Sequence, residues 1–246
     1  MCVLNKPSVT AAGLLLLVQA FHMAVAAPFS VGPVRLSMSS EAPSTTVEVR
    51  SGDFQHSMLL QVTPYRWTQK NGVRVLSEEK DLQVFPAVFK LAPGEIRNVF
   101  IRSDKAHDAP RYYRLKIEEL QSDTGIDPAA RLAFLRAFDI PVFVESENAK
   151  PELAAAAFMI GDDTVQIDIS NQGQAFFAAT NLSLVRRHDT SDVIVELSQL
   201  SYVLPGSERS LQIEIDQAIS DTEDMVVSVS DINGKIALTI PVQPVE

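Results

Sequence analysis

Short stretches in which apolar and polar residues alternate run through most of the chain, with the period of β-strands that bury one face. Clear examples lie at residues 45–50, 58–67 and 112–120, and a first strand is expected from Phe29 to Leu36. Turn-forming pairs such as Asn71-Gly72 separate these stretches. Short strands with regularly spaced turn signals predict an all-β chain built of sandwiches.

The segment before residue 145 admits two interpretations. Alanines and leucines make residues 128–138 compatible with a helix. The large apolar residues nevertheless keep to one parity, interrupted by Arg136: Leu132, Phe134, Phe138, Ile140, Val142 and Val144. This alternation favours a long strand that runs from Leu132 to Val144.

A polar segment at residues 146–151 ends in a proline, as linkers between domains do, and the strand pattern restarts beyond it. The N-terminus has one charge, Lys6, an apolar run at residues 11–20 and the small residues of Ala24-Val25-Ala26. These features predict a signal peptide at 1–26, because the run is too short for a membrane anchor, the alternative interpretation. The predicted domains are then 27–147 and 148–246, about 220 residues in all, which fits two domains of ordinary size.

Charge and cysteine content exclude several classes of function. The formal net charge of -10 makes a nucleic-acid partner improbable, because phosphates repel an acidic chain. The single cysteine, Cys2, would leave with the signal peptide. The exported chain would then have no disulfide, thiol nucleophile or thiolate metal site.

No pattern of catalytic or ligand-binding residues stands out. The histidines are isolated, and none of them pairs with another at a metal-binding spacing: His22, His56, His107 and His188. No nucleophile elbow, phosphate-binding loop or dinucleotide fingerprint occurs, and the acidic pairs are interpreted as solvated turns. We therefore expect no enzymatic activity, metal, cofactor or small-molecule substrate.

The order of several segments resembles that of the periplasmic pilus chaperones of the chaperone–usher pathway, and is most similar to the archaic branch of that family. Each segment alone is a weak signal, but their shared order and spacing extend over nearly the whole exported chain. They are residues 29–36, 62–69, 84–94, 113–120, 140–144 and 202–206.

The resemblance implies two immunoglobulin-like β-sandwiches set at an angle, with a cleft between them. Such chaperones act in the periplasm, where they lend a strand to a pilus subunit that lacks its own last strand, and they deliver the subunit to an outer-membrane usher. Main-chain hydrogen bonds then provide affinity, alternate side chains fill a groove, and an aggregation-prone edge is covered. The implied partners are thus pilus subunits and an usher.

The resemblance also assigns roles to residues. It makes Arg35 the anchor of the subunit's terminal carboxylate, which a guanidinium grips with two hydrogen bonds. It makes Leu132, Phe134 and Phe138 the lent strand. From the sequence alone, a solvated strand residue is the commoner interpretation of an arginine such as Arg35, and only the resemblance favours the anchor. The apolar row could be an ordinary core strand.

The family's second basic anchor, a lysine, aligns with Pro141, so this role is vacant or is taken by Arg136. Two other classes of function remain open: an exported structural or adhesion sandwich of a pilus system, and a secreted enzyme on a sandwich scaffold. The sequence also leaves open whether the free protein self-associates through the exposed strand.

Overall fold

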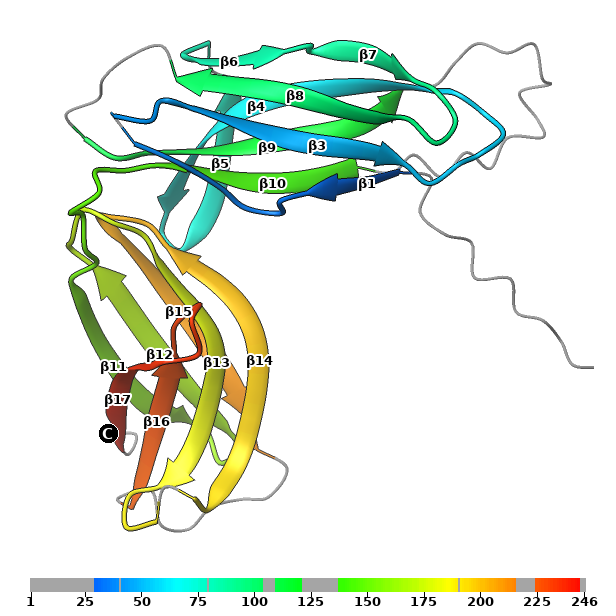
Figure 1. The fold of residues 1–246 in the computed structure, drawn as a ribbon. Helices are drawn as coiled ribbons and strands as arrows, with labels where there is room; N and C mark the ends of the chain where they lie inside the picture. Colours follow the sequence, from blue (N-terminus) through cyan, green and yellow to red (C-terminus); the bar gives the residue numbers. More distant parts are fainter. Residues whose placement is uncertain are drawn as a thin grey trace, which may run out of the picture.

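The computed structural model describes residues 29–39, 41–78, 80–103, 109–120, 137–189, 191–215 and 224–243. All regular structure in these ranges is β, in seventeen strands. Strands β1–β10 form one sandwich and β11–β17 a second, and the two meet end to end in a bent molecule (Figure 1). This confirms the predicted all-β fold of two sandwiches. The predicted signal peptide, like Leu132, Phe134 and Arg136, lies outside the described residues.

The first sandwich pairs a four-stranded sheet with a six-stranded one. The first sheet has the order β1 (Phe29–Gly32), β3 (Ser44–Ser51), β8 (Ile96–Ser103) and β6 (Leu82–Phe85). The second has the order β2 (Leu36–Met38), β10 (Ala137–Val144), β9 (Arg111–Leu120), β4 (Met58–Lys70) and β5 (Val73–Glu78), and β7 (Val88–Leu91) also pairs with β4.

The expected single strand from Phe29 to Leu36 is wrong, because the chain changes sheets there. β1 pairs with β3 in one sheet, whereas β2 pairs in parallel with the end of β10 in the other. The change of sheet buries Phe29 and Leu36 in the same core from opposite layers. Full burial of one such side chain stabilises the fold by about 1.5–3 kcal/mol.

The second sandwich has the strand order β14-β13-β16-β17-β11-β12-β15. Its strands are β11 (Leu153–Ile160), β12 (Thr164–Asn171), β13 (Phe177–Arg186), β14 (Val193–Val203), β15 (Ser207–Glu214), β16 (Met225–Ser230) and β17 (Ile236–Gln243). The fully buried Asn171 donates from its side chain to the carbonyls of Ala175 (2.8 Å) and Val203 (3.1 Å). Its side-chain oxygen accepts from the amides of Glu152 (3.1 Å) and Gly173 (3.0 Å), so both polar atoms of the buried amide have partners, as burial requires.

The Asn71-Gly72 hairpin signal is confirmed as the turn between β4 and β5. Both residues have positive φ, 50° and 70°, which is the backbone that a two-residue hairpin turn of this kind requires. The turn contacts the second domain, since Arg209 Nη1 donates to the Gly72 carbonyl over 2.7 Å. The turn that the sequence predicted locally therefore also contributes a contact between the two domains.

An aromatic cluster joins the two domains. The first domain contributes Trp67, Tyr112 and Phe143, and the second contributes Leu204 with the partly buried Phe176 and Tyr202. The rings of Phe143 and Phe176 stack with their centroids 3.8 Å apart. These contacts give the two sandwiches a defined relative placement.

Polar contacts reinforce this junction. The Gln69 side chain donates to the Tyr202 carbonyl (2.7 Å) and accepts from the Leu204 amide (2.8 Å), so it binds the second domain as a neighbouring strand would. Glu145 Oε1 accepts from the Tyr112 hydroxyl (2.7 Å) and from the Phe176 amide (2.8 Å). Burial raises the pKa of the Glu145 carboxyl, although both hydrogen bonds act to lower it.

Candidate functional site: a free strand edge beside a basic cluster

Part of β10 has an unpaired edge. Its residues Ala137–Val144 all pair with β9, but β2 covers the other edge only at Val142–Val144. Among the described residues, no strand pairs with the outer edge of Ala137–Pro141. An open edge is a template on which another chain can add a strand. Going towards the N-terminus, this edge leads to the segment of Leu132, Phe134 and Arg136, which lies outside the described residues.

Phe138 lies at this edge, but its side chain turns inwards. The ring is half-buried, packs on the first domain's core and meets Phe29 edge to face, with centroids 5.1 Å apart. The expectation that the Phe138 side chain is exposed until a partner arrives is therefore corrected. The alternation of β10 places Phe138 on the same face as Ile140 and Val142, which are both in the core.

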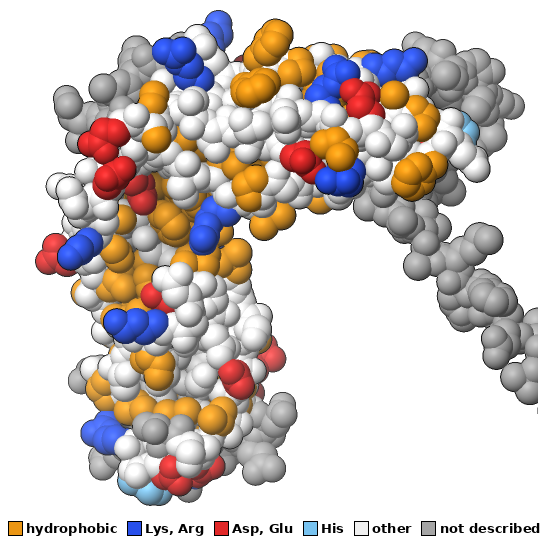
Figure 2. Space-filling view, in the orientation of Figure 1, with side chains coloured by type: hydrophobic (Ala, Val, Ile, Leu, Met, Phe, Trp, Pro, Cys, Tyr) orange, Lys and Arg blue, Asp and Glu red, His pale blue; other side chains and the backbone are white. Residues whose placement is uncertain are grey.

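Arg35 lies in the connection where the chain changes sheets, directly before β2, and it is exposed. The charge of Arg35 acts on Tyr202 at the domain junction. Burial raises the pKa of the Tyr202 hydroxyl, whereas the positive charges of Arg35 and Arg114 act to lower it. Both arginines therefore lie near the second domain's Tyr202, where the two domains meet. Figure 2 shows that the surface is hollowed on the inner side of the bend.

Arg114 is a basic residue of this region that the sequence analysis did not single out. It stands on β9 directly opposite Pro141, the position that the resemblance aligns with the family's second basic anchor. Its Nε lies 2.8 Å from Asp139 Oδ1, and its guanidinium stacks over the Trp67 ring at 4.8 Å. Asp139 also accepts from Arg74 Nη1 over 2.6 Å.

Arg74 and Arg114 thus share the Asp139 carboxylate, and the charge of Arg35 acts on the nearby Tyr202, so three arginines and the one carboxylate shared by two of them lie in this region of a chain that is acidic overall. Arg114 lies between the core residues Tyr113 and Leu115 on β9, so the alternation in the sequence indicates that its side chain faces away from the core. Only the strand register showed that it faces Pro141.

A second feature is an aromatic pair on the outer face of the four-stranded sheet. Phe85 on β6 and Phe100 on β8 are directly paired across the strands, and they are 74% and 58% exposed. Val88 and Ile96 are also exposed. Figure 2 shows hydrophobic side chains over β6 and β8 with basic residues around them. Exposed aromatic clusters of this kind mark interaction surfaces.

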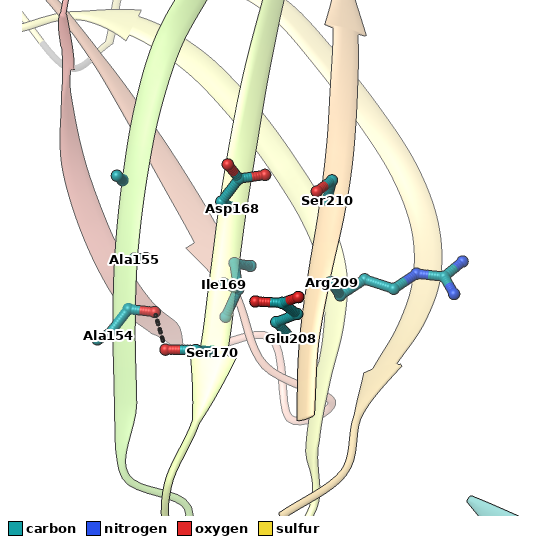
Figure 3. A pocket seen from close by; sticks show the side chains of 9 residues that line it. Ala154, Ala155, Asp168, Ile169, Ser170, Glu208, Arg209 and Ser210 are labelled. Atoms are coloured by element: carbon teal, nitrogen blue, oxygen red, sulfur yellow. Dashed lines mark hydrogen bonds between the residues drawn. The ribbon is translucent and has the colours of Figure 1, made fainter. Parts of the chain in front are cut away.

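A shallow hollow of about 480 Å³ lies over β11, β12 and β15 of the second domain (Figure 3). Apart from Ile169 its lining residues are small or polar, and Asp168 already accepts hydrogen bonds from Gln166. The Arg209 side chain points away from it, towards the first domain. No apolar pocket with converging polar groups is formed, so the hollow does not have the character of a small-molecule site.

Other classes of site can be checked within the described residues. In them, no three His, Cys, Asp or Glu side chains converge as a metal site would require. No helix in the same ranges has the length and apolarity needed to cross a membrane.

Comparison with known proteins gives the fold a context. No protein-family model matches the chain, and no curated protein matches its sequence. Solved structures do match. A chain of the CsuC–CsuE chaperone–tip adhesion subunit complex, from the archaic chaperone–usher Csu pili of Acinetobacter baumannii, superposes with a TM-score of 0.62 at 20% identity, over 89% of this chain and 100% of that one.

A chain of the Salmonella enterica complex of the SafA pilin with the SafB chaperone superposes with a TM-score of 0.55 at 14% identity, over 86% of this chain and 94% of that one. Further matches at similar scores are the class 5 fimbriae chaperone CfaA, the E. coli chaperone DraB and the periplasmic chaperone SfaE. At these identities the likeness concerns the fold, which agrees with the resemblance noted in the sequence. The chain has the two-domain β-sandwich fold of the chaperone–usher pilus chaperones.

Proposed function

We propose that this protein is a non-enzymatic periplasmic chaperone that binds pilus subunits by lending them a strand. The free edge of β10 at Ala137–Pro141, beside a basic cluster, is the observation that supports this most directly. The structural matches include chaperones bound to a tip subunit and to a pilin. A sandwich that lacks a strand would pair with this edge, and main-chain hydrogen bonds would supply affinity without ATP.

Side chains would then set position and specificity. Leu132 and Phe134 precede the free edge and would enter the subunit's open groove, whereas Phe138 stays in its own core and contributes through its main chain. Arg35 would hold the subunit's terminal carboxylate. Arg114 is our preferred second anchor because it faces Pro141, and Arg136 remains the alternative from the sequence. Two guanidinium groups suit a carboxylate because each offers paired donors.

Delivery to an outer-membrane usher needs a surface that a bound subunit leaves accessible. The Phe85–Phe100 pair meets this requirement, because it belongs to the four-stranded sheet, whereas β10 belongs to the six-stranded one. We propose this pair as the docking surface for the usher.

The test of subunit capture is co-expression of the exported chain with a pilus subunit, followed by co-purification. Arg35→Ala should abolish a stable complex, because loss of a charged anchor that becomes buried in the complex costs about 2–5 kcal/mol. Arg35→Lys should restore part of the binding, since lysine keeps the charge but not the planar fork. Arg114→Ala should weaken binding as well.

Arg50→Ala is the matched control, because Arg50 is exposed on β3 in the other sheet and pairs with Glu48. It should bind subunits as the parent does, and all variants should unfold at the parent's denaturant concentration. Normal capture by Arg35→Ala would contradict the anchor. A failure of the parent chain to retain any subunit would contradict the chaperone function and favour the structural pilus protein.

A further inference from the structure

Within the part of the chain that the structure describes, strand β5 has an unpaired edge that is separate from the edge of β10. It is the last strand of the six-stranded sheet, and among the described residues it pairs only with β4. All six of its residues are exposed, including Val73 (63%), Val75 (42%) and Leu76 (38%). A strand with one free edge and exposed apolar residues on both faces is a surface that proteins normally cover or blunt.

The charges of β5 are complementary to those of a second β5. If two copies pair antiparallel about Leu76, residues equally distant from Leu76 face each other. Arg74 then stands opposite Glu78 of the second copy, twice by symmetry, and Leu76 stands opposite Leu76. Opposite charges at directly facing positions stabilise a strand pair, whereas like charges destabilise it. The β5 sequence thus favours one register, and that register is self-complementary, as a two-fold interface requires.

The other long edge strands lack this property. The pairing of β14 with β13 shifts register twice, which makes an irregular edge. On β15, two-fold pairing about Leu211 would place the exposed Glu208 opposite Glu214 of the second copy, a repulsive pair. The edge strands β1 and β6 are only four residues long.

We propose that the free protein forms a symmetric dimer by antiparallel pairing of β5 about Leu76, independently of β10. The interface adds one strand to each sheet, so that the two six-stranded sheets become continuous. A single short edge makes the association weak and concentration-dependent. The occupant is a second copy of this chain and not a subunit, because the register and the charge pairs are those of β5 with itself.

The test is cysteine cross-linking of the exported chain, which has no cysteine of its own when it begins at Ala27. Facing residues of an antiparallel pair have Cα atoms about 4.5–5.5 Å apart, within the range that a disulfide spans. Leu76→Cys should therefore form a disulfide-linked dimer under mild oxidation. Val193→Cys is the control, on the exposed edge strand β14 (48% exposed), and should cross-link far more slowly.

Charge reversal tests the register. Added to Leu76→Cys, Glu78→Lys should slow cross-linking about threefold to tenfold, because two attractive pairs become repulsive. Adding Arg74→Glu to that variant should restore the rate, since opposite charges face each other again. Unfolding curves confirm that each variant is folded.

Equal rates for Leu76→Cys and Val193→Cys would overturn the proposal. So would indifference of the rate to the charge reversals. Cross-linking of Leu76→Cys to a subunit in preference to a second copy would also overturn it, even if subunit capture itself were normal.

Discussion

The carboxyl of Glu145 tests whether the domain junction is understood. Glu145 follows β10, and its Oε1 accepts hydrogen bonds from Tyr112 of the first domain and Phe176 of the second. Burial raises its pKa above the ordinary value of about 4.3. The folded protein therefore binds this proton more tightly than the unfolded chain does. Its stabilising contribution is complete below the ordinary pKa and is lost as pH rises through the raised value.

Glu145→Gln removes this loss and keeps an acceptor oxygen for both donors. At neutral pH the variant should be more stable than the parent, by about 1.4 kcal/mol for each unit by which the pKa of Glu145 is raised. In acid the Glu145 carboxyl is also neutral, so the difference in stability between the two proteins should shrink. Glu145→Ala should instead leave the Tyr112 hydroxyl and the Phe176 amide without an acceptor, at a cost of about 1–3 kcal/mol for each group.

Urea unfolding at mildly acidic and neutral pH measures these effects. Trp67 is the single tryptophan and is buried at the junction, so its fluorescence reports on this region. Glu147→Gln is the control, because Glu147 is exposed two residues away and should not alter the pH dependence. A Glu145→Gln protein that is less stable than the parent at neutral pH, with the parent's pH dependence, would refute the reasoning.

Three further predictions follow from the contacts described. Phe138→Ala should destabilise the free protein by at most about 3 kcal/mol, because its ring packs on the core. Phe134→Ala should barely shift unfolding but should weaken subunit binding. A denaturant melt and a co-purification measure the two effects, and the reverse pattern would reject this division of roles. Gln69→Ala should lower the free energy of unfolding by about 1–3 kcal/mol and broaden the distribution of domain orientations in small-angle scattering. An unchanged scattering profile would mean that the aromatic cluster alone holds the domain junction. The exported chain should begin at Ala27 and unfold at the same point with or without reductant, which N-terminal sequencing and a melt would check.

Much of the fold could be predicted from local pattern. Alternating residues placed Val47 and Val49 of β3, and Leu115 and Ile117 of β9, with their side chains in the core. The Asn71-Gly72 turn was recognisable because few other residue pairs adopt positive φ at two successive positions. These features depend on a residue and its near neighbours in the chain, so the sequence alone carries them.

Other features depend on which strands become neighbours, and the tertiary structure decided them. The change of sheet between Gly32 and Leu36 could not be read from an apolar pattern that continues through both strands. Within the described ranges, the outer edge of β10 is free before Val142 because β2 pairs only with Val142–Val144. Arg114 faces Pro141 through a strand register that local periodicity does not specify. Phe138 shows the limit most clearly: alternation assigned its parity, but a core face and a partner-binding face have the same parity signal. Only the packing of Phe29 against the ring distinguished them, because burial is a property of two segments that meet and not of either one alone.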